Sequence, residues 1–101
     1  MQNIVLSGHL IGDCEVKTDK KGCNYIRFKV ACEDPDLSGK SQITIYRCYS
    51  CRLDYKNLKD NDLVFIDGQL VLTQKNDTIT LDVLVQSIDR ADDLKPSCTN
   101  S

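Results

Sequence analysis

Apolar and polar residues alternate in several segments of this chain, and that period of two constrains the fold more than any other feature of the sequence. Alternation places successive side chains on opposite faces of an extended strand, whereas a helix repeats its apolar residues every three or four positions. Clusters of polar, turn-forming residues separate the alternating segments. The sequence therefore predicts five strands, at residues 3–12, 24–32, 42–50, 63–73 and 78–89.

The order of these segments narrows the choice among all-β folds. A short helix is predicted over residues 51–59, between the third and fourth strands, where two leucines fall on nearly the same side. Glycines inside the first and fourth strands predict bends that let a strand curve round a barrel: Gly8, Gly12 and Gly68. Five strands alone also fit a small sandwich or an SH3-like barrel. The position of the helix favours an all-β, five-stranded oligonucleotide/oligosaccharide-binding (OB) barrel.

The length of the chain allows one domain, because 101 residues can bury a single core but not two. We expect this domain to span residues 1–89. The polar segment 90–101 contains Pro96 and has no periodicity, so we expect a flexible C-terminal tail there. The first residues have neither the basic region of a signal peptide nor the long apolar run of a transmembrane helix. The sequence therefore predicts a cytoplasmic protein with no membrane partner.

The charge of the chain argues both against and for nucleic acid as a partner. The formal net charge is -2 and the pI is about 5.2, whereas a protein that neutralises phosphates usually has an excess of Lys and Arg. The carboxylates, however, gather in the second half of the chain, and many of the cations lie in the first half. This asymmetry permits a basic face on an acidic molecule.

The cysteines and the single histidine bear on metals and catalysis. Six cysteines would indicate a disulfide scaffold in a secreted chain of this size, but without a secretory signal we expect reduced thiols that behave as small apolar residues. Cys48 and Cys51 have the C-x-x-C spacing of a zinc site, yet His9 is the only histidine and nothing completes four ligands. We therefore expect no metal and no cofactor. No pair of residues suits acid–base or nucleophilic catalysis, so we expect no enzyme activity.

One face of the second predicted strand mixes an aromatic ring with two cations, Tyr25, Arg27 and Lys29. Arg47 and Tyr49 share a face of the third predicted strand, and they would lie beside the first three residues if the two strands are neighbours. Binding of single-stranded nucleic acid without sequence preference needs cations for the phosphates and flat rings on which bases stack. The alternative is an ordinary solvated face, because Tyr and Arg are common on exposed sheets.

Two lysines of the charged turn at residues 17–22 are weaker candidates. Lys17 and Lys21 could contact backbone phosphates, and plain solvation is an equally weighted alternative. By alternation, Phe28 and Tyr46 point away from the cations of their strands, so we expect both rings in the core. The candidate nucleic-acid-binding residues are therefore Lys17, Lys21, Tyr25, Arg27, Lys29, Arg47 and Tyr49.

Four segments, in unbroken order, resemble motifs of one known family: 3-NIVLSGHLIGDCEVK-17, 22-GCNYIRFKVA-31, 45-IYRCYSC-51 and 57-NLKDNDLVFIDGQL-70. Over about residues 2–89 the sequence is similar to the bacterial single-stranded DNA-binding protein family. The resemblance implies an OB barrel that binds single-stranded DNA with little sequence preference, in DNA replication, repair or recombination. It also implies a homo-oligomer, a dimer or a tetramer, that is not an enzyme.

The departures from that family are as informative as the matches. The chain has no Trp, and Ile45 and Cys51 stand where the family often has stacking rings. Residues 71–74 are uncharged where a basic run is frequent, and the long tail with an acidic tip is missing. A short, tail-less member resembles the primosomal replication protein N subgroup. The alternative function is therefore a primosome-type or other protein-assembly module, with replication or restart proteins as partners and weak or no DNA binding.

Overall fold

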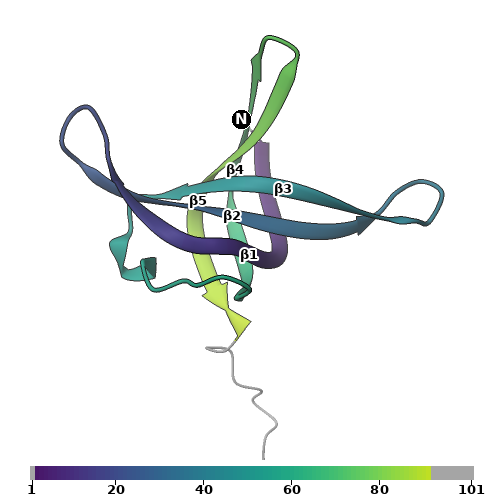
Figure 1. The fold of residues 1–101 in the computed structure, drawn as a ribbon, viewed down its shortest axis with the longest axis horizontal. Coiled ribbons are helices and arrows are strands. Elements are labelled where there is room, and N and C mark those ends of the chain that lie inside the picture. The colour runs from purple at the N-terminus through teal and green to yellow at the C-terminus, as the bar shows by residue number, and fades with distance from the viewer. Residues whose placement is uncertain (1, 92–101) are drawn as a thin grey trace, which may run out of the picture.

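The computed structural model describes residues 2–91, and these form five strands and one short 3-10 turn. Their bounds are Gln2–Thr18 (β1), Asn24–Pro35 (β2), Ser41–Ser50 (β3), Leu53–Tyr55 (η1), Leu63–Lys75 (β4) and Thr78–Arg90 (β5). The strands close into a barrel in the order β1-β2-β3-β5-β4 (Figure 1). All neighbours are antiparallel except β3 and β5, which pair in parallel. The predicted all-β OB barrel is confirmed.

The interior of the barrel is filled by the apolar face of each alternating strand. On β2, Ile26, Phe28 and Val30 are buried while the residues between them face outward, as the sequence predicts. Strands β4 and β5 contribute Val64, Ile66 and Val83, among others, to the same core. Burying these side chains removes apolar surface from water and is the main favourable term in folding a small domain. The outward rows are therefore free to carry other functions.

Glycines mark the places where strands bend or approach closely. The pairing of β1 with β2 shifts register between Ile11 and Glu15, around Gly12 with its φ of 75°. The pairing of β4 with β5 shifts between Asp67 and Gly68, and a Cβ on Gly68 would collide with the carbonyl oxygen of Leu84. The bends predicted at these glycines are confirmed, and they let the long strands curve into a barrel.

Three hairpins extend beyond the barrel (Figure 1). They are built from the ends of strands that are longer than the sequence predicts. Strand β1 continues to Thr18, so Lys17, expected in a loop, lies in the strand opposite Tyr25. Strand β2 continues to Pro35, into a segment expected to be loop. Strand β5 ends at Arg90, and the rest of the predicted tail, from residue 92, lies outside the described residues.

The short helix predicted between the third and fourth strands is found as the 3-10 turn Leu53–Tyr55, which is much shorter than the predicted range 51–59. The segment that follows forms backbone hydrogen bonds with β1. The Leu58 carbonyl accepts from the Cys14 N–H, and the Asn61 N–H donates to the Leu10 carbonyl. These bonds to β1 replace the bonds that a helix would make within itself, and a helix this short is marginal without strong packing. Among the described residues, no helix has the length and apolar character needed to cross a membrane.

Candidate nucleic-acid interface

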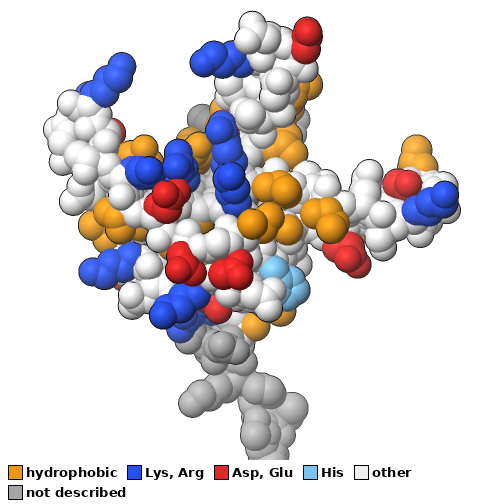
Figure 2. All heavy atoms as spheres, in the orientation of Figure 1, with side chains coloured by type: hydrophobic (Ala, Val, Ile, Leu, Met, Phe, Trp, Pro, Cys, Tyr) orange, Lys and Arg blue, Asp and Glu red, His pale blue; other side chains and the backbone are white. Residues whose placement is uncertain are grey.

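The outward faces of β1, β2, β3 and β5 form one continuous surface, which we call the four-strand face. Strands β2 and β3 are neighbours, and Arg27 lies opposite Tyr49 while Lys29 lies opposite Arg47. The side-by-side arrangement expected for these residues is therefore found. Cross-strand partners form two rows of outward residues in the middle of this face, each running from β1 through β2 and β3 to β5. The first row is Glu15, Arg27, Tyr49 and Leu84, and the second row is Ile11, Lys29, Arg47 and Asp82. Figure 2 shows Lys and Arg side chains on this face of the molecule, with Asp, Glu and hydrophobic side chains beside them.

At one end of the four-strand face two tyrosines lie together. The ring centroids of Tyr25 and Tyr49 are 6.3 Å apart with an interplanar angle of 44°. Both rings are half-buried and, with exposed Leu84, line an open groove of about 590 Å³. Burial raises the pKa of the Tyr49 hydroxyl, and the charge of Asp82 raises it further. Two rings with accessible surface can each offer a flat contact to a base.

Arg47 is held by a carboxylate from β5. Its Nε donates to Asp82 Oδ1 at 2.7 Å and its second guanidinium nitrogen donates to Oδ2 at 3.1 Å. This two-pronged bond raises the pKa of Arg47 and fixes the plane of its guanidinium. A guanidinium has five N–H donors, so donors remain for a phosphate. The pairing depends on the parallel contact of β3 with β5, which no local pattern in the sequence indicates.

A second carboxylate, Glu15 on β1, lies between two of the candidate cations. Its side chain accepts from Arg27 at 3.0 Å, and its other oxygen lies 3.6 Å from the ammonium of Lys17. The hydrogen bond from Arg27, together with the charge of Lys17, lowers the pKa of Glu15. Both ion pairs are exposed to solvent, where such pairs are weak and salt-sensitive. Sequence reasoning missed Glu15 and Asp82 as neighbours of the cations.

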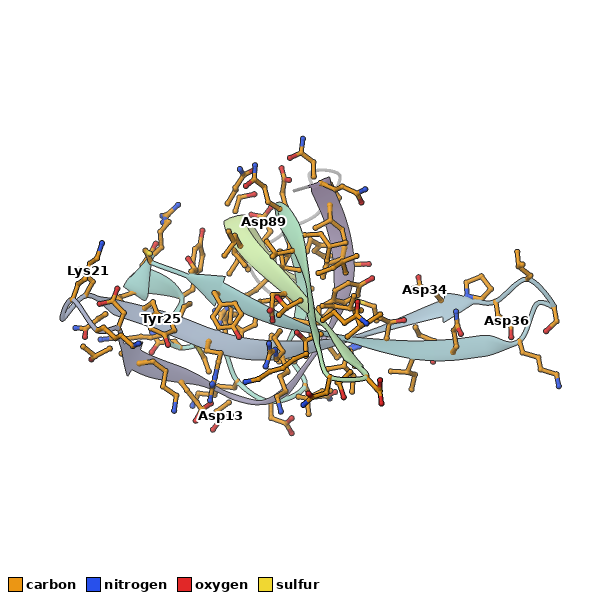
Figure 3. The ribbon with its side chains drawn as sticks, turned by 90° about the horizontal axis from the view of Figure 1, so that it is seen from above. Asp13, Lys21, Tyr25, Asp34, Asp36 and Asp89 are labelled. Carbon is orange, nitrogen blue, oxygen red and sulfur yellow. The ribbon has the colours of Figure 1, made fainter. Side chains whose placement is uncertain are left out.

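The remaining two predicted residues behave differently from each other. Lys29 is exposed in the middle of the four-strand face and makes no ion pair with any residue between 2 and 91. Lys21 lies at the tip of the β1–β2 hairpin, away from the barrel, where its backbone N–H donates to Asp19 (Figure 3). The structure thus brings six of the seven candidates onto one surface and leaves Lys21 at its periphery.

At the opposite end from the tyrosines, the four-strand face is aliphatic. A groove of about 360 Å³ is lined by Ile11, Ile45, Ile79 and Leu81, and the side chains of Lys29 and Arg47 border it. Its first three residues come from three different strands and have exposed fractions of 42%, 49% and 61%. Sequence reasoning placed Ile45 on the same strand face as Arg47 and Tyr49, but treated it only as a position where the resembled family often has a stacking ring. Ile79 was not recognisable as its neighbour, because β5 meets β3 only when the barrel closes, and Ile11 reaches the groove through the pairing of β1 with β2.

The cysteines are not arranged as a metal site within the described chain. Cys48 is buried in the core, whereas Cys51 is exposed, so the two residues of the C-x-x-C lie in different environments. Burial raises the pKa of Cys48 to about 12. No group of three or more His, Cys, Asp or Glu suited to a metal ion is found between residues 2 and 91.

Comparison with known proteins identifies the fold. No family model and no curated protein matches the sequence. Among solved structures, a small single-stranded DNA-binding protein from Streptomyces coelicolor superposes with a TM-score of 0.70 at 14% identity, over 87% of this chain and 90% of that one. A Plasmodium falciparum SSB in complex with ssDNA gives 0.62 at 18% identity, over 89% and 92%. The dimeric N-terminal domain of PriB from Thermoanaerobacter tencongensis gives 0.57 at 22% identity, over 89% and 96%. The chain therefore has the OB fold of these proteins, which is the fold that its sequence resemblance predicted.

Proposed function

We propose that the protein binds single-stranded DNA with little sequence preference through the four-strand face. The observation that carries this proposal is the placement of the Tyr25–Tyr49 ring pair beside Arg27, Lys29 and Arg47 on one open surface. The structural neighbours support it, since they include single-stranded DNA-binding proteins and one complex with single-stranded DNA.

The binding mode follows from the chemistry of the two central rows. Cations of β2 and β3 would contact successive phosphates, while bases would stack on the tyrosines, each stack contributing roughly 1–3 kcal/mol. Every base has a flat face and every nucleotide has a phosphate, so such contacts discriminate little among sequences. No step of this mode requires a bond to be made or broken, so we propose a binding protein and not an enzyme.

The same surface predicts weak and salt-sensitive binding. Three of its cations, Lys17, Arg27 and Arg47, already lie next to carboxylates, and the whole chain carries a net charge of -2. A phosphate must therefore compete with Glu15 or Asp82 for these groups. The affinity for a single strand falls with salt with a slope of about -0.7 per phosphate contact, so few effective contacts give a modest affinity at physiological salt.

A titration of fluorescent oligo-dT at low and moderate salt tests the proposal. We expect saturable binding at low salt and a loss of about tenfold to a hundredfold in the Arg27→Ala/Arg47→Ala variant, with a smaller salt slope. Lys40→Ala/Lys59→Ala removes two exposed cations outside the four-strand face and is the matched control. Absence of binding at low salt, or an equal loss in both variants, would refute the assignment.

We also propose self-association, and a role in DNA replication, repair or recombination. The pairing of β1 with β2 begins at His9, so residues 2–8 have one edge without a neighbouring strand within the described part of the chain. Val5 lies on this part of β1 and is 79% exposed. An open strand edge with an exposed apolar side chain favours pairing with a second copy. The dimeric PriB neighbour supports a dimer or a higher homo-oligomer.

A protein-assembly role with weak or no DNA binding is the second candidate. The observation that favours it is the neutralisation of Arg47 by Asp82, which occupies two of the guanidinium donors. In this case the four-strand face would serve replication or restart proteins, and oligo-dT would not bind even at low salt. The titration above therefore separates the two candidates.

A further inference from the structure

The aliphatic groove at one end of the four-strand face is chemically unlike the tyrosine end. Its apolar wall consists of Ile11, Ile45, Ile79 and Leu81, and no aromatic ring lines it. No carboxylate lines it either, although both ends belong to one continuous surface. Branched aliphatic side chains exposed to this degree present methyl groups to whatever lies in the groove.

Two cations border the groove, and they determine which part of a DNA strand at the proposed site can lie in it. Lys29 is an exposed ammonium without an ion pair among residues 2–91, and Arg47 projects beside it. A phosphate held between these cations would place the attached base over the isoleucines. The groove therefore continues the proposed DNA path, with a positive border that suits the backbone and an apolar wall that suits a base.

Among the four DNA bases, only thymine carries a methyl group, at C5. Apolar side chains are the usual protein partners of that methyl group. An aliphatic wall offers no aromatic stacking, so its contribution comes from apolar surface removed from water, and the thymine methyl adds to that surface. Cytosine and uracil present a hydrogen at the same position and would gain less from the same wall.

We propose that this groove is a thymine-preferring subsite, in which Ile11, Ile45 and Ile79 contact the C5-methyl while Lys29 and Arg47 hold the adjacent phosphate. The inference rests on the proposed function and deepens it. The tyrosine end accepts any base, and the isoleucine end adds a modest preference for thymine. Binding thus retains little overall sequence preference but is not uniform across sequences.

The test compares oligo-dT with oligo-dU of equal length and label in fluorescence titrations at low salt. The two ligands share backbone and sugar and differ only in the C5-methyl group. We expect oligo-dT to bind about fourfold more tightly, the factor given by full burial of one methyl-sized group. In Ile45→Thr/Ile79→Thr we expect both affinities to fall, that for oligo-dT more than that for oligo-dU, so that their ratio moves towards one. Threonine keeps the β-branched shape of the strand residues and replaces an apolar group by a hydroxyl.

A matched control is Leu37→Thr, which makes the same kind of change at the exposed turn between β2 and β3. It should leave the ratio of oligo-dT to oligo-dU affinity at the wild-type value. Equal affinities for the two ligands, or an unchanged ratio in Ile45→Thr/Ile79→Thr, would overturn the subsite while leaving single-strand binding intact. Failure of both ligands to bind would instead overturn the proposed function, and the subsite with it.

Discussion

Two carboxylates decide how much positive charge on the four-strand face is available to a phosphate. Asp82 contacts Arg47 through both of its oxygens and therefore orients the guanidinium as well as neutralising it. Glu15 lies between Lys17 and Arg27 and is itself exposed, so its main effect on a ligand is electrostatic. At the scale of single residues, the two carboxylates thus have different consequences for DNA binding.

Replacing Glu15 by Gln should therefore strengthen binding. The change removes the charge that competes with phosphate for Arg27 and Lys17 while keeping an acceptor at the same place. We expect the affinity for oligo-dT at low salt to rise about twofold to fivefold, the range typical of exposed ion pairs. Glu33→Gln on the distal part of β2 is the control and should have a smaller effect. Weaker binding by Glu15→Gln would show that this carboxylate orients the cations and does not merely mask them.

The thiols give a residue-scale test of the fold itself. Burial raises the pKa of Cys48 to about 12, so at pH 8 this thiol stays protonated and unreactive as well as inaccessible. Cys23 and Cys51 are exposed. Brief treatment with iodoacetamide at pH 8, followed by peptide mapping, should modify these two cysteines and spare Cys48. Denatured protein should be modified at all three. Equal modification of Cys48 and Cys51 in the folded protein would contradict the barrel as described.

At the scale of elements, alternation predicted the strands well because each side chain of a half-buried strand is either inside or outside. That rule placed Tyr25, Arg27 and Lys29 on the outer face correctly. The extent of the turn in 51–59 could not be predicted in the same way, because from Leu58 onward the backbone also bonds to β1, which is distant in sequence. Local pattern carries no information about such bonds, and tertiary contacts override weak helix propensity.

The candidate site was predictable only where neighbouring strands follow each other in the chain. Strands β2 and β3 form a hairpin, so the meeting of Arg27 with Tyr49 followed from sequence order. The meeting of Arg47 with Asp82 needs the parallel contact of β3 with β5, which exists only once the barrel closes. Ile79 joins the aliphatic groove for the same reason. The sequence thus indicated the cations and rings, while their ion-pair partners required the structure.

The bend in β4 provides a test of an element. A Cβ on Gly68 would collide with the backbone carbonyl of Leu84, and backbone cannot move aside as a flexible side chain can. We expect Gly68→Ala to lower the free energy of unfolding by about 2 kcal/mol or more, measured by urea denaturation. Ser87→Ala, an exposed change on β5 opposite Asp67, should stay within about 0.5 kcal/mol of the wild type. Equal midpoints for both variants would argue against the close approach of β4 and β5.

At the scale of the whole molecule, the charge balance of the four-strand face differs from the slightly negative net charge of the chain. The four-strand face carries four cations, Lys17, Arg27, Lys29 and Arg47, and the two carboxylates Glu15 and Asp82. Asp34 and Asp36 lie out along the β2–β3 hairpin, away from Lys21 at the other hairpin (Figure 3). A single strand crossing the barrel would therefore avoid the acidic hairpin and follow β2 and β3 towards the tyrosines. Net charge alone, the first argument against nucleic acid, is a poor guide when charges are arranged in this way.

Self-association is also a property of the whole molecule. If residues 2–8 pair with a second copy, light scattering should give a mass of at least twice the 11.4 kDa of the chain. Val5→Glu places a charge on the proposed contact and should lower the mass towards that of a monomer without unfolding the barrel, as circular dichroism can check. A wild-type mass of one chain at tens of micromolar would exclude a stable oligomer.

The most direct test of the central claim is a nuclear magnetic resonance titration that maps where oligo-dT binds. In amide spectra of the labelled protein, we predict that the largest shifts fall on outward residues of β2 and β3: Tyr25, Arg27, Lys29, Arg47 and Tyr49. Amides of the β1–β4 side, such as Val5 and Phe65, should shift little. Shifts confined to that side, or no shifts at low salt and saturating oligo-dT, would contradict the assignment of the four-strand face as the single-strand site.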